Sequence, residues 1–505
     1  MAMVTAMAMV TTQKIILDLL MDNLRVRATK AMLWDLLGNY GGQLTAFILS
    51  IFLARLLSPE EFGLVGMSLV FIGMLEIFKD FGFGSALIQS NQNTSLTYSS
   101  VFYFSVLSGI VFTVLIFLSA PLIADFFNRS EIVILVQLLS VTFFISSLNI
   151  VQLTILRKRL DFKIITLRNL TSQVISGLVA VVLAFNGFGV YSLVVQQLLS
   201  AIIATILLWK LSDWKPTMEF SFKELKKLTS FSLYVFLANS VDRMLHQFDT
   251  VVIGKLFTPT TLGYYTRANS LNRMVIINSS RSISRIFYPT LAEIKSDPER
   301  FEKIYLKVIN VVSSIAIFLT GLFYLIGEEL IIGLFGLKWK ASVPIFQVVI
   351  LKGFTFPLSA MVINAFLAKG MSKENFHLGN VRKVLQLIPF VFAYYFGFYA
   401  FLYAIVGTSF LSWLLNFIFA KKLLTIKLKT QLGAVVPYLV GVSLIILGIS
   451  NILPQKFSYL WAAIKMLIFI ISYFVLLLVI KAPVLIEGLS LLKNLNKSKS
   501  KKNGS

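Results

Sequence analysis

Long apolar blocks alternate along the chain with short polar connections. Val101–Ala120 and Val435–Leu453 contain no charged residue at all. A block of about 20 apolar residues spans the hydrocarbon core of a bilayer as a helix, so the pattern predicts about fourteen membrane-spanning helices. We expect them near residues 33–56, 62–84, 99–124, 131–155, 164–185, 188–210, 230–255, 261–288, 303–326, 342–368, 380–396, 398–420, 432–452 and 458–480.

Composition supports an all-α polytopic membrane protein. Of the 505 residues, 57% are hydrophobic and 14% are charged, whereas soluble chains average about 45–50% and about 25%. The net charge of +23 could indicate nucleic acid, but basic cytoplasmic loops explain it better. The chain has no cysteine, and His246 and His377 are too few for a histidine metal cluster. We therefore expect no cofactor, no metal and no nucleic-acid partner.

The distribution of Lys and Arg predicts the orientation. With both termini in the cytoplasm, the outer connections and their flanks hold only Arg55, Arg129, Lys255, Lys338, Lys340 and Lys456, out of 46 basic residues. Such a bias towards the cytoplasmic side is the usual topological signal. We expect an N-terminal cytoplasmic extension (1–30), an N-lobe (31–211), a cytoplasmic linker (212–229), a C-lobe (230–421), two further spans (430–480) and a basic cytoplasmic tail (481–505).

A repeat relates the two lobes. Ala54–Pro59 resembles Gly254–Pro259, and at the same offset Gly63 corresponds to Gly263. Each copy ends one apolar span and opens the next. Six spans separate the copies, so both halves have the same orientation. This pattern predicts a parallel repeat about an axis along the membrane normal, which is a common plan in transporters.

The usual enzyme motifs are absent. The chain contains no Walker A pattern, no HExxH and no GxSxG elbow, which are the signatures of ATPases, zinc proteases and α/β-hydrolases. The outer connections are also short, whereas a membrane polymerase or glycosyltransferase needs a sizeable outer loop. A transporter is therefore favoured over an enzyme, although a carboxylate site within the membrane stays open.

Ionisable residues within spans are costly and usually functional. On span 7, Asp242, His246 and Asp249 share one helical face beside Arg243. The other candidates are Arg267 and Arg273 on span 8, Asp35, Asn39 and Gln43 on span 1, Lys79 and Asp80 on span 2 beside Glu76, and Lys352 on span 10.

We interpret Arg243, Arg267, Arg273 and Lys352 as cavity cations for an anionic substrate, because arginine binds phosphate in a bidentate manner. The remaining candidates would be polar cavity residues or would couple transport to an ion. Internal ion pairs or snorkelling of long side chains near span ends would explain the same charges without a substrate.

Several sequence strings resemble one transporter family. They are Leu53–Gly63, Asp80–Gln89, Asp249–Lys255, Leu262–Ala268, Phe287–Pro289, Asp297–Arg300 and Phe335–Trp339. Together they resemble the Wzx-type lipopolysaccharide or colanic-acid exporters of the multidrug/oligosaccharidyl-lipid/polysaccharide superfamily. The connection Ser90–Ser100 departs from these relatives, because it contains no Lys or Arg.

This resemblance implies two six-helix bundles arranged as a V, plus two C-terminal helices, in a bacterial cytoplasmic membrane. It implies flipping of an undecaprenyl-diphosphate-linked oligosaccharide from the cytoplasmic to the periplasmic leaflet. Our own hypothesis for the mechanism is alternating access, with coupling to an ion gradient. Membrane lipids and the polymerase and glycosyltransferases of the same pathway are the expected partners. A multidrug-type exporter, a peptidoglycan-precursor flippase and a membrane glycan polymerase are the alternatives.

Overall fold

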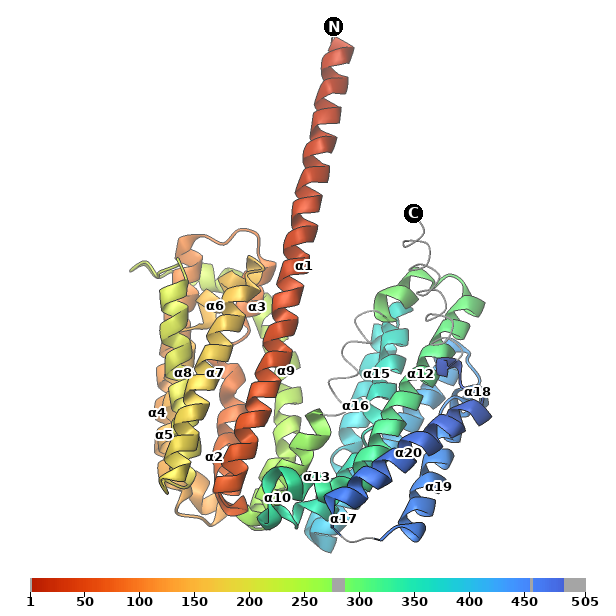
Figure 1. The fold of residues 1–505 in the computed structure, drawn as a ribbon. Coiled ribbons are helices and arrows are strands. Elements are labelled where there is room, and N and C mark those ends of the chain that lie inside the picture. Colours follow the sequence, from red (N-terminus) through yellow and green to blue (C-terminus); the bar gives the residue numbers. More distant parts are fainter. Residues whose placement is uncertain (1, 275–286, 455–456, 486–505) are drawn as a thin grey trace, which may run out of the picture. The chain divides into compact units, whose positions relative to one another are not determined.

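The computed structural model consists of helices (Figure 1) and describes residues 2–274, 287–454 and 457–485. Within helices, the side chains of residues 2–28, 77, 238, 239, 241, 242 and 246 lie outside the description. Among the described residues, nine helices are long and apolar enough to cross a membrane. The pair α5 (Ile132–Ser147) and α6 (Ile150–Lys158), bent by 45°, makes a tenth candidate. The prediction of an all-α polytopic membrane protein is confirmed.

Differences from the fourteen predicted spans have local causes. Helix α2 (Pro59–Leu75) has only 17 residues, because the predicted span 62–84 is broken after Leu75. Residues 372–424 count as one candidate span, although the backbone turns at Gly397 (φ 84°) between the two predicted spans. Part of the predicted span 261–288 lies outside the described residues.

The first of two compact units comprises Met1–Thr260. Its elements are α1 (Ala2–Leu56), α2, η1 (Glu76–Lys79), α3 (Phe83–Gln89), α4 (Ser95–Phe127), α5, α6, α7 (Phe162–Phe185), α8 (Val190–Leu211) and α9 (Phe222–Leu256). Helix α7 packs between α1 and α8, whereas α9 packs against α2, α3 and α4. The predicted lobe boundary at 212–229 stays a prediction.

The start of α2 follows directly from the repeated sequence motif. Ser58 is the N-cap, Pro59 opens the helix, and the Ser58 side chain and backbone exchange hydrogen bonds with Glu61 in a capping box. Such a box satisfies N–H groups that the helix itself leaves unpaired. The second copy of the motif gives the same start, because α10 (Pro259–Asn272) also begins at its proline.

Gly63 permits a very close approach of two chain segments. A Cβ atom placed on Gly63 would overlap the backbone carbonyl of Pro259, and backbone cannot move aside like a side-chain tip. We expect Gly63→Ala to destabilise the protein by about 1–3 kcal/mol, measured as thermal unfolding in detergent. Gly407→Ala is the matched control, because an added Cβ there meets nothing within 4 Å. Equal stability of the two variants would contradict the prediction.

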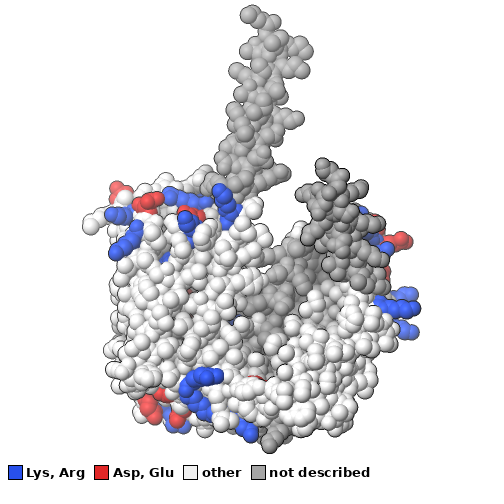
Figure 2. All heavy atoms as spheres, in the orientation of Figure 1, with Lys and Arg blue, Asp and Glu red and all other residues white. Residues whose placement is uncertain are grey.

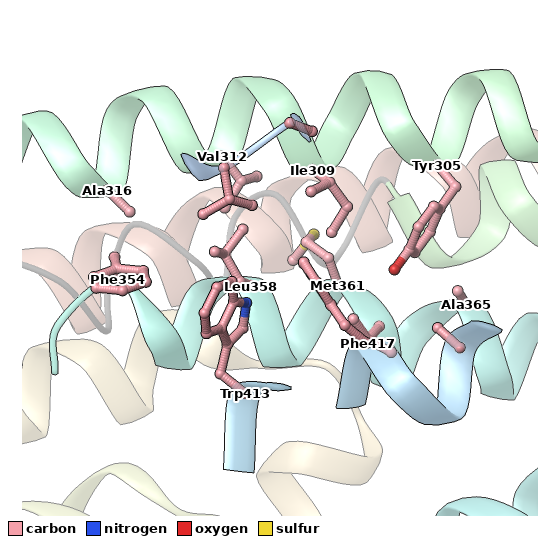
Figure 3. Close-up of a cluster of buried hydrophobic side chains, with 14 of the residues drawn as sticks. Tyr305, Ile309, Val312, Ala316, Phe354, Leu358, Met361, Ala365, Trp413 and Phe417 are labelled. Carbon is pink, nitrogen blue, oxygen red and sulfur yellow. The ribbon is translucent and has the colours of Figure 1, made fainter. Parts of the chain in front are cut away.

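The second unit comprises Thr261–Ser505. After the described part of α10 come α12 (Pro298–Leu325), α13 (Gly327–Phe335), η3 (Leu337–Trp339), α14 (Ser342–Leu351), α15 (Thr355–Ala368), α16 (Ser372–Leu385), α17 (Ile388–Leu424), α18 (Leu428–Gly433), α19 (Val436–Ile452) and α20 (Tyr459–Val479). Helices α12, α15 and α17 meet in a core of buried side chains (Figure 3), with Ile309, Leu358 and Phe417 each 0% exposed.

Polar contacts fasten α18 and the two C-terminal helices, α19 and α20, to this core. Tyr305 donates to Gln431 (2.9 Å), Tyr438 to Asn310 (2.7 Å) and Tyr473 to the backbone oxygen of Ser314 (2.7 Å). Beyond the end of α12, Lys465 of α20 pairs with Glu329 of α13 at 3.1 Å. Hydrogen bonds between helices are a recognised source of cohesion where lipid removes the hydrophobic driving force.

The surface is that of a protein embedded in lipid. On the visible face of the first unit, charged side chains gather at the two ends of the helices and leave a largely uncharged band between them (Figure 2). Within this unit Leu118, Leu122 and Phe185 are 69%, 70% and 79% exposed. Water would penalise so continuous an apolar surface, whereas hydrocarbon does not.

Candidate substrate-binding site

The break in the second predicted span creates a polar turn inside the first unit. Helix α2 ends at Leu75, and the four-residue 3₁₀ turn η1 follows. Phe81 (φ 47°) and Gly82 (φ 81°) then have positive φ angles before α3 begins. The Asp80 carboxylate accepts hydrogen bonds from the backbone N–H groups of Gly82 (3.0 Å) and Gly84 (3.3 Å). Asp80 therefore stabilises the turn in which it lies.

Close packing fixes this turn against α9. A Cβ atom on Gly73 would overlap the side-chain amide of Gln247, and one on Gly82 would overlap the backbone oxygen of Ser232. The ring of Phe236 lies 4.9 Å from that of Phe78 and 5.2 Å from that of Phe81, between centroids. The polar segment is thus held between two points of contact with one helix.

An ion cluster lies between these contacts. One oxygen of the Glu76 carboxylate is 2.7 Å from the Lys79 amine, and the other is 2.9 Å from Nη1 of Arg243 on α9. The side chains of Glu76 and Arg243 are 46% and 50% exposed. Since both residues fall inside predicted spans, the turn and α9 bring two cations and one carboxylate together where charge is expensive.

The other candidates on α9 lie within six residues of Arg243 in the sequence. Asp249 is half-buried, and the side chains of Asp242 and His246 lie outside the described residues. Near the C-terminal end of α9, Lys255 donates to the backbone oxygen of Phe126 (2.5 Å) and lies over the Phe126 ring. Lys255 is therefore part of helix packing.

The polar residues of α1 lie along a helix that packs on α7. Asp35 and Gln43 are half-buried, whereas Asn39 is exposed. Close packing with α7 occurs at Gly38, where an added Cβ would overlap the hydroxyl of Thr166. The cavity role predicted for the three polar residues stays a prediction.

The cations of the second unit have different surroundings. Arg267 on α10 is only 8% exposed, and its guanidinium lies 5.0 Å from the Phe335 ring centroid and 5.3 Å from that of Trp339. This cation–π packing explains how Arg267 can be buried without a bound substrate. Arg273 is exposed, and Lys352 is half-buried where α14 ends. Their substrate-binding roles stay predictions.

Glu76 was noted within the second predicted span, but its sequence position gave it no role in the site. It belongs to the second predicted span, but its partner Arg243 is 167 residues away in the chain. The local signal was the spacing of Glu76 and Lys79, which lie three residues apart and face each other on a helical turn. That spacing also occurs on ordinary exposed helices, so the sequence alone did not distinguish it.

Comparisons with known proteins agree on one family. The family described as "Polysaccharide biosynthesis protein" matches residues 52–344. The teichuronic acid biosynthesis protein TuaB of Bacillus subtilis is 26% identical, covering 71% of this chain and 74% of its own. The succinoglycan biosynthesis transport protein ExoT of Rhizobium meliloti is 26% identical (66% and 68% covered). The lipopolysaccharide biosynthesis protein WzxC of Escherichia coli is 24% identical (67% and 69%).

Solved structures show the same fold. The lipid II flippase MurJ in an inward closed conformation superposes with a TM-score of 0.71 at 16% identity, covering 88% of this chain and 98% of its own. An inward-facing multidrug resistance transporter of the MATE family gives a TM-score of 0.61 at 18% identity, covering 76% and 94%. At these identities the likeness concerns the fold alone.

Proposed function

Because the chain belongs to the polysaccharide biosynthesis protein family, we propose that it is a flippase for an undecaprenyl-diphosphate-linked oligosaccharide. It is a transporter of the multidrug/oligosaccharidyl-lipid/polysaccharide superfamily rather than an enzyme. The substrate would be the repeat unit of a surface polysaccharide, carried from the cytoplasmic to the outer leaflet. Similar proteins are named for lipopolysaccharide, succinoglycan and teichuronic acid biosynthesis.

The meeting of Lys79 and Arg243 at one point of the first unit carries this proposal. Diphosphate is the charged part of the substrate, and guanidinium and ammonium groups are its usual ligands in proteins. Their 2.7 Å and 2.9 Å contacts with Glu76 hold the two cations at one carboxylate. Cations inside the predicted spans would compensate the cost of moving an anion through hydrocarbon.

The mechanism we propose is alternating access by movement of the two lobes. The lipid tail stays in the bilayer while the diphosphate and sugars pass through a polar path. Arg243 and Lys79 hold the diphosphate first, and Arg267, Arg273 and Lys352 belong to the proposed remainder of the path. Asp242, His246 and Asp249, with Asp35, Asn39 and Gln43, would provide its polar lining or the coupling to an ion gradient.

The proposed setting is a bacterial cytoplasmic membrane with both chain termini in the cytoplasm. The basic bias of the predicted inner connections supports this orientation. Glycosyltransferases that build the lipid-linked unit would act before the protein, and a polymerase would act after it on the outer leaflet. Anionic lipid headgroups would contact the basic tail, residues 481–505.

Reconstitution into liposomes tests the function. We expect the purified full-length protein to move a fluorescent undecaprenyl-diphosphate-linked oligosaccharide between leaflets, measured by the fraction that a membrane-impermeant quencher reaches. Protein-free liposomes and liposomes with an unrelated polytopic protein are the controls. Extrusion of cationic dyes without lipid movement would instead identify a multidrug-type exporter. Movement of lipid II in preference to the oligosaccharide lipid would identify a peptidoglycan-precursor flippase.

A further inference from the structure

The ion cluster of the first unit places two cations at a single carboxylate. Glu76 supplies one carboxylate, and Lys79 and Arg243 supply two cations around it. The nearby carboxylate of Asp80 is engaged with the backbone of its own turn. Two cations that share one carboxylate can also bind a further anion with two charged oxygens.

The geometry leaves the cluster open to such an anion. The side chains of Glu76 and Arg243 are about half exposed, at 46% and 50%. A guanidinium has five N–H donors in a planar fork, and the contact with Glu76 uses Nη1. A half-exposed ion pair is also weak, worth up to about 1 kcal/mol, so a stronger anionic ligand can replace it.

The rigid surroundings hold the backbone near Glu76 while its side chain exchanges with another anion. The backbone of the turn is held by the Phe78, Phe81 and Phe236 rings and by a hydrogen bond from Ser108 to the backbone oxygen of Phe78 (2.8 Å). Only the end of the Glu76 side chain must move to release Arg243. A small rotation of one side chain would therefore switch the two cations from an internal partner to a ligand.

We propose that the Glu76 carboxylate is a resident anion, which occupies Arg243 and Lys79 until the diphosphate of the substrate displaces it. This inference rests on the proposed function for the identity of the ligand. A diphosphate esterified at both ends has one ionised oxygen on each phosphorus, which matches the two cations. When the substrate leaves, Glu76 returns to the cations and prevents rebinding. Glu76 thus lowers affinity and promotes release.

Glu76→Gln tests the proposal, because it keeps the shape of the side chain and removes its charge. With full-length protein in nanodiscs and undecaprenyl diphosphate as the probe, we expect binding to tighten roughly fivefold. Undecaprenol, which lacks the diphosphate, should bind equally to the variant and the wild type. In liposomes, the concentration for half-maximal flipping should fall, and the maximal rate should fall as well.

Two comparisons separate this role from a structural one. In an Arg243→Gln background, Glu76→Gln should lose most of its effect on diphosphate binding. Glu224→Gln is the matched control, because Glu224 also pairs with a lysine three residues on, Lys227. Hydrogen bonds from Lys227 and from Thr97 hold the pKa of Glu224 below its usual value, so the control also removes a permanent charge.

Defined outcomes overturn the proposal. Unchanged or weaker diphosphate binding by Glu76→Gln would do so, as would equal tightening for undecaprenol. Glu76→Ala should also bind undecaprenyl diphosphate more tightly than the wild type. The proposal therefore stays testable if Glu76→Gln fails to fold. Diphosphate binding that follows the prediction without any flipping would refute the proposed function and leave the inference standing. Flipping with unaltered kinetics in Glu76→Gln would refute the inference about Glu76 and leave the proposed function standing.

Discussion

Replacing Arg243 with alanine should abolish export of the surface polymer while the protein still inserts in the membrane. Arg243 is half exposed on α9 and paired with Glu76 at 2.9 Å. Its removal deletes the guanidinium that would hold the diphosphate, and it leaves Glu76 with Lys79 as its cationic partner in the cluster. Loss of a bidentate charge-assisted contact costs about 3 kcal/mol, which corresponds to a loss of about 100-fold in affinity.

The measurement is surface polymer on intact cells, together with the amount of the protein in the membrane fraction. Lys255→Ala is the matched control, since Lys255 is a cation on the same helix whose contacts are with the Phe126 backbone and ring. We expect that variant to keep export. Arg243→Lys should be intermediate, because it retains the charge and loses the planar fork. Normal export by Arg243→Ala would remove this residue from the mechanism.

The parts of the fold set by local composition could be predicted from the sequence. Val101–Ala120 had to form a spanning helix, because a charge-free block of that length satisfies its backbone in lipid only as a helix, and it lies within α4. The motif at Ser58–Pro59 predicted the start of α2 for an equally local reason. Broken spans were harder, because the left-handed backbone at Phe81 and Gly82 depends on packing against α9.

Side-chain partners far apart in the chain could not be predicted. Glu76 and Arg243 meet through the packing of the α2–η1 segment on α9, which no periodicity encodes. Arg267 has the same sequence character as Arg243, yet it lies beneath the rings of Phe335 and Trp339. Two arginines within spans can therefore look alike in the sequence and differ in structure, one in an ion pair and the other packed against aromatic rings. The choice between them depends on residues contributed by other elements.

A second large effect is expected at the ion pair of the second unit. Lys465 and Glu329 are 3.1 Å apart, with side-chain exposures of 10% and 5%, and they join α20 to α13. Lys465→Met would leave the Glu329 carboxylate buried without this cation. Breaking a buried pair in this way costs about 3–5 kcal/mol. We expect a large loss of thermal stability in detergent and a lower yield of folded protein.

The double variant Glu329→Leu/Lys465→Met tests whether the ion pair stabilises the fold or only offsets the cost of burying its two charges. Desolvation of two charges offsets most of their attraction, so replacing both with apolar side chains should restore much of the stability lost by Lys465→Met. Glu328→Gln, at the half-buried neighbouring position, is the control and should change stability little. Stability of Lys465→Met equal to that of the wild type would contradict the prediction. If the double variant is no better than the single one, the pair itself contributes the cohesion between α13 and α20, and polar contacts rather than apolar packing hold the last helix in place.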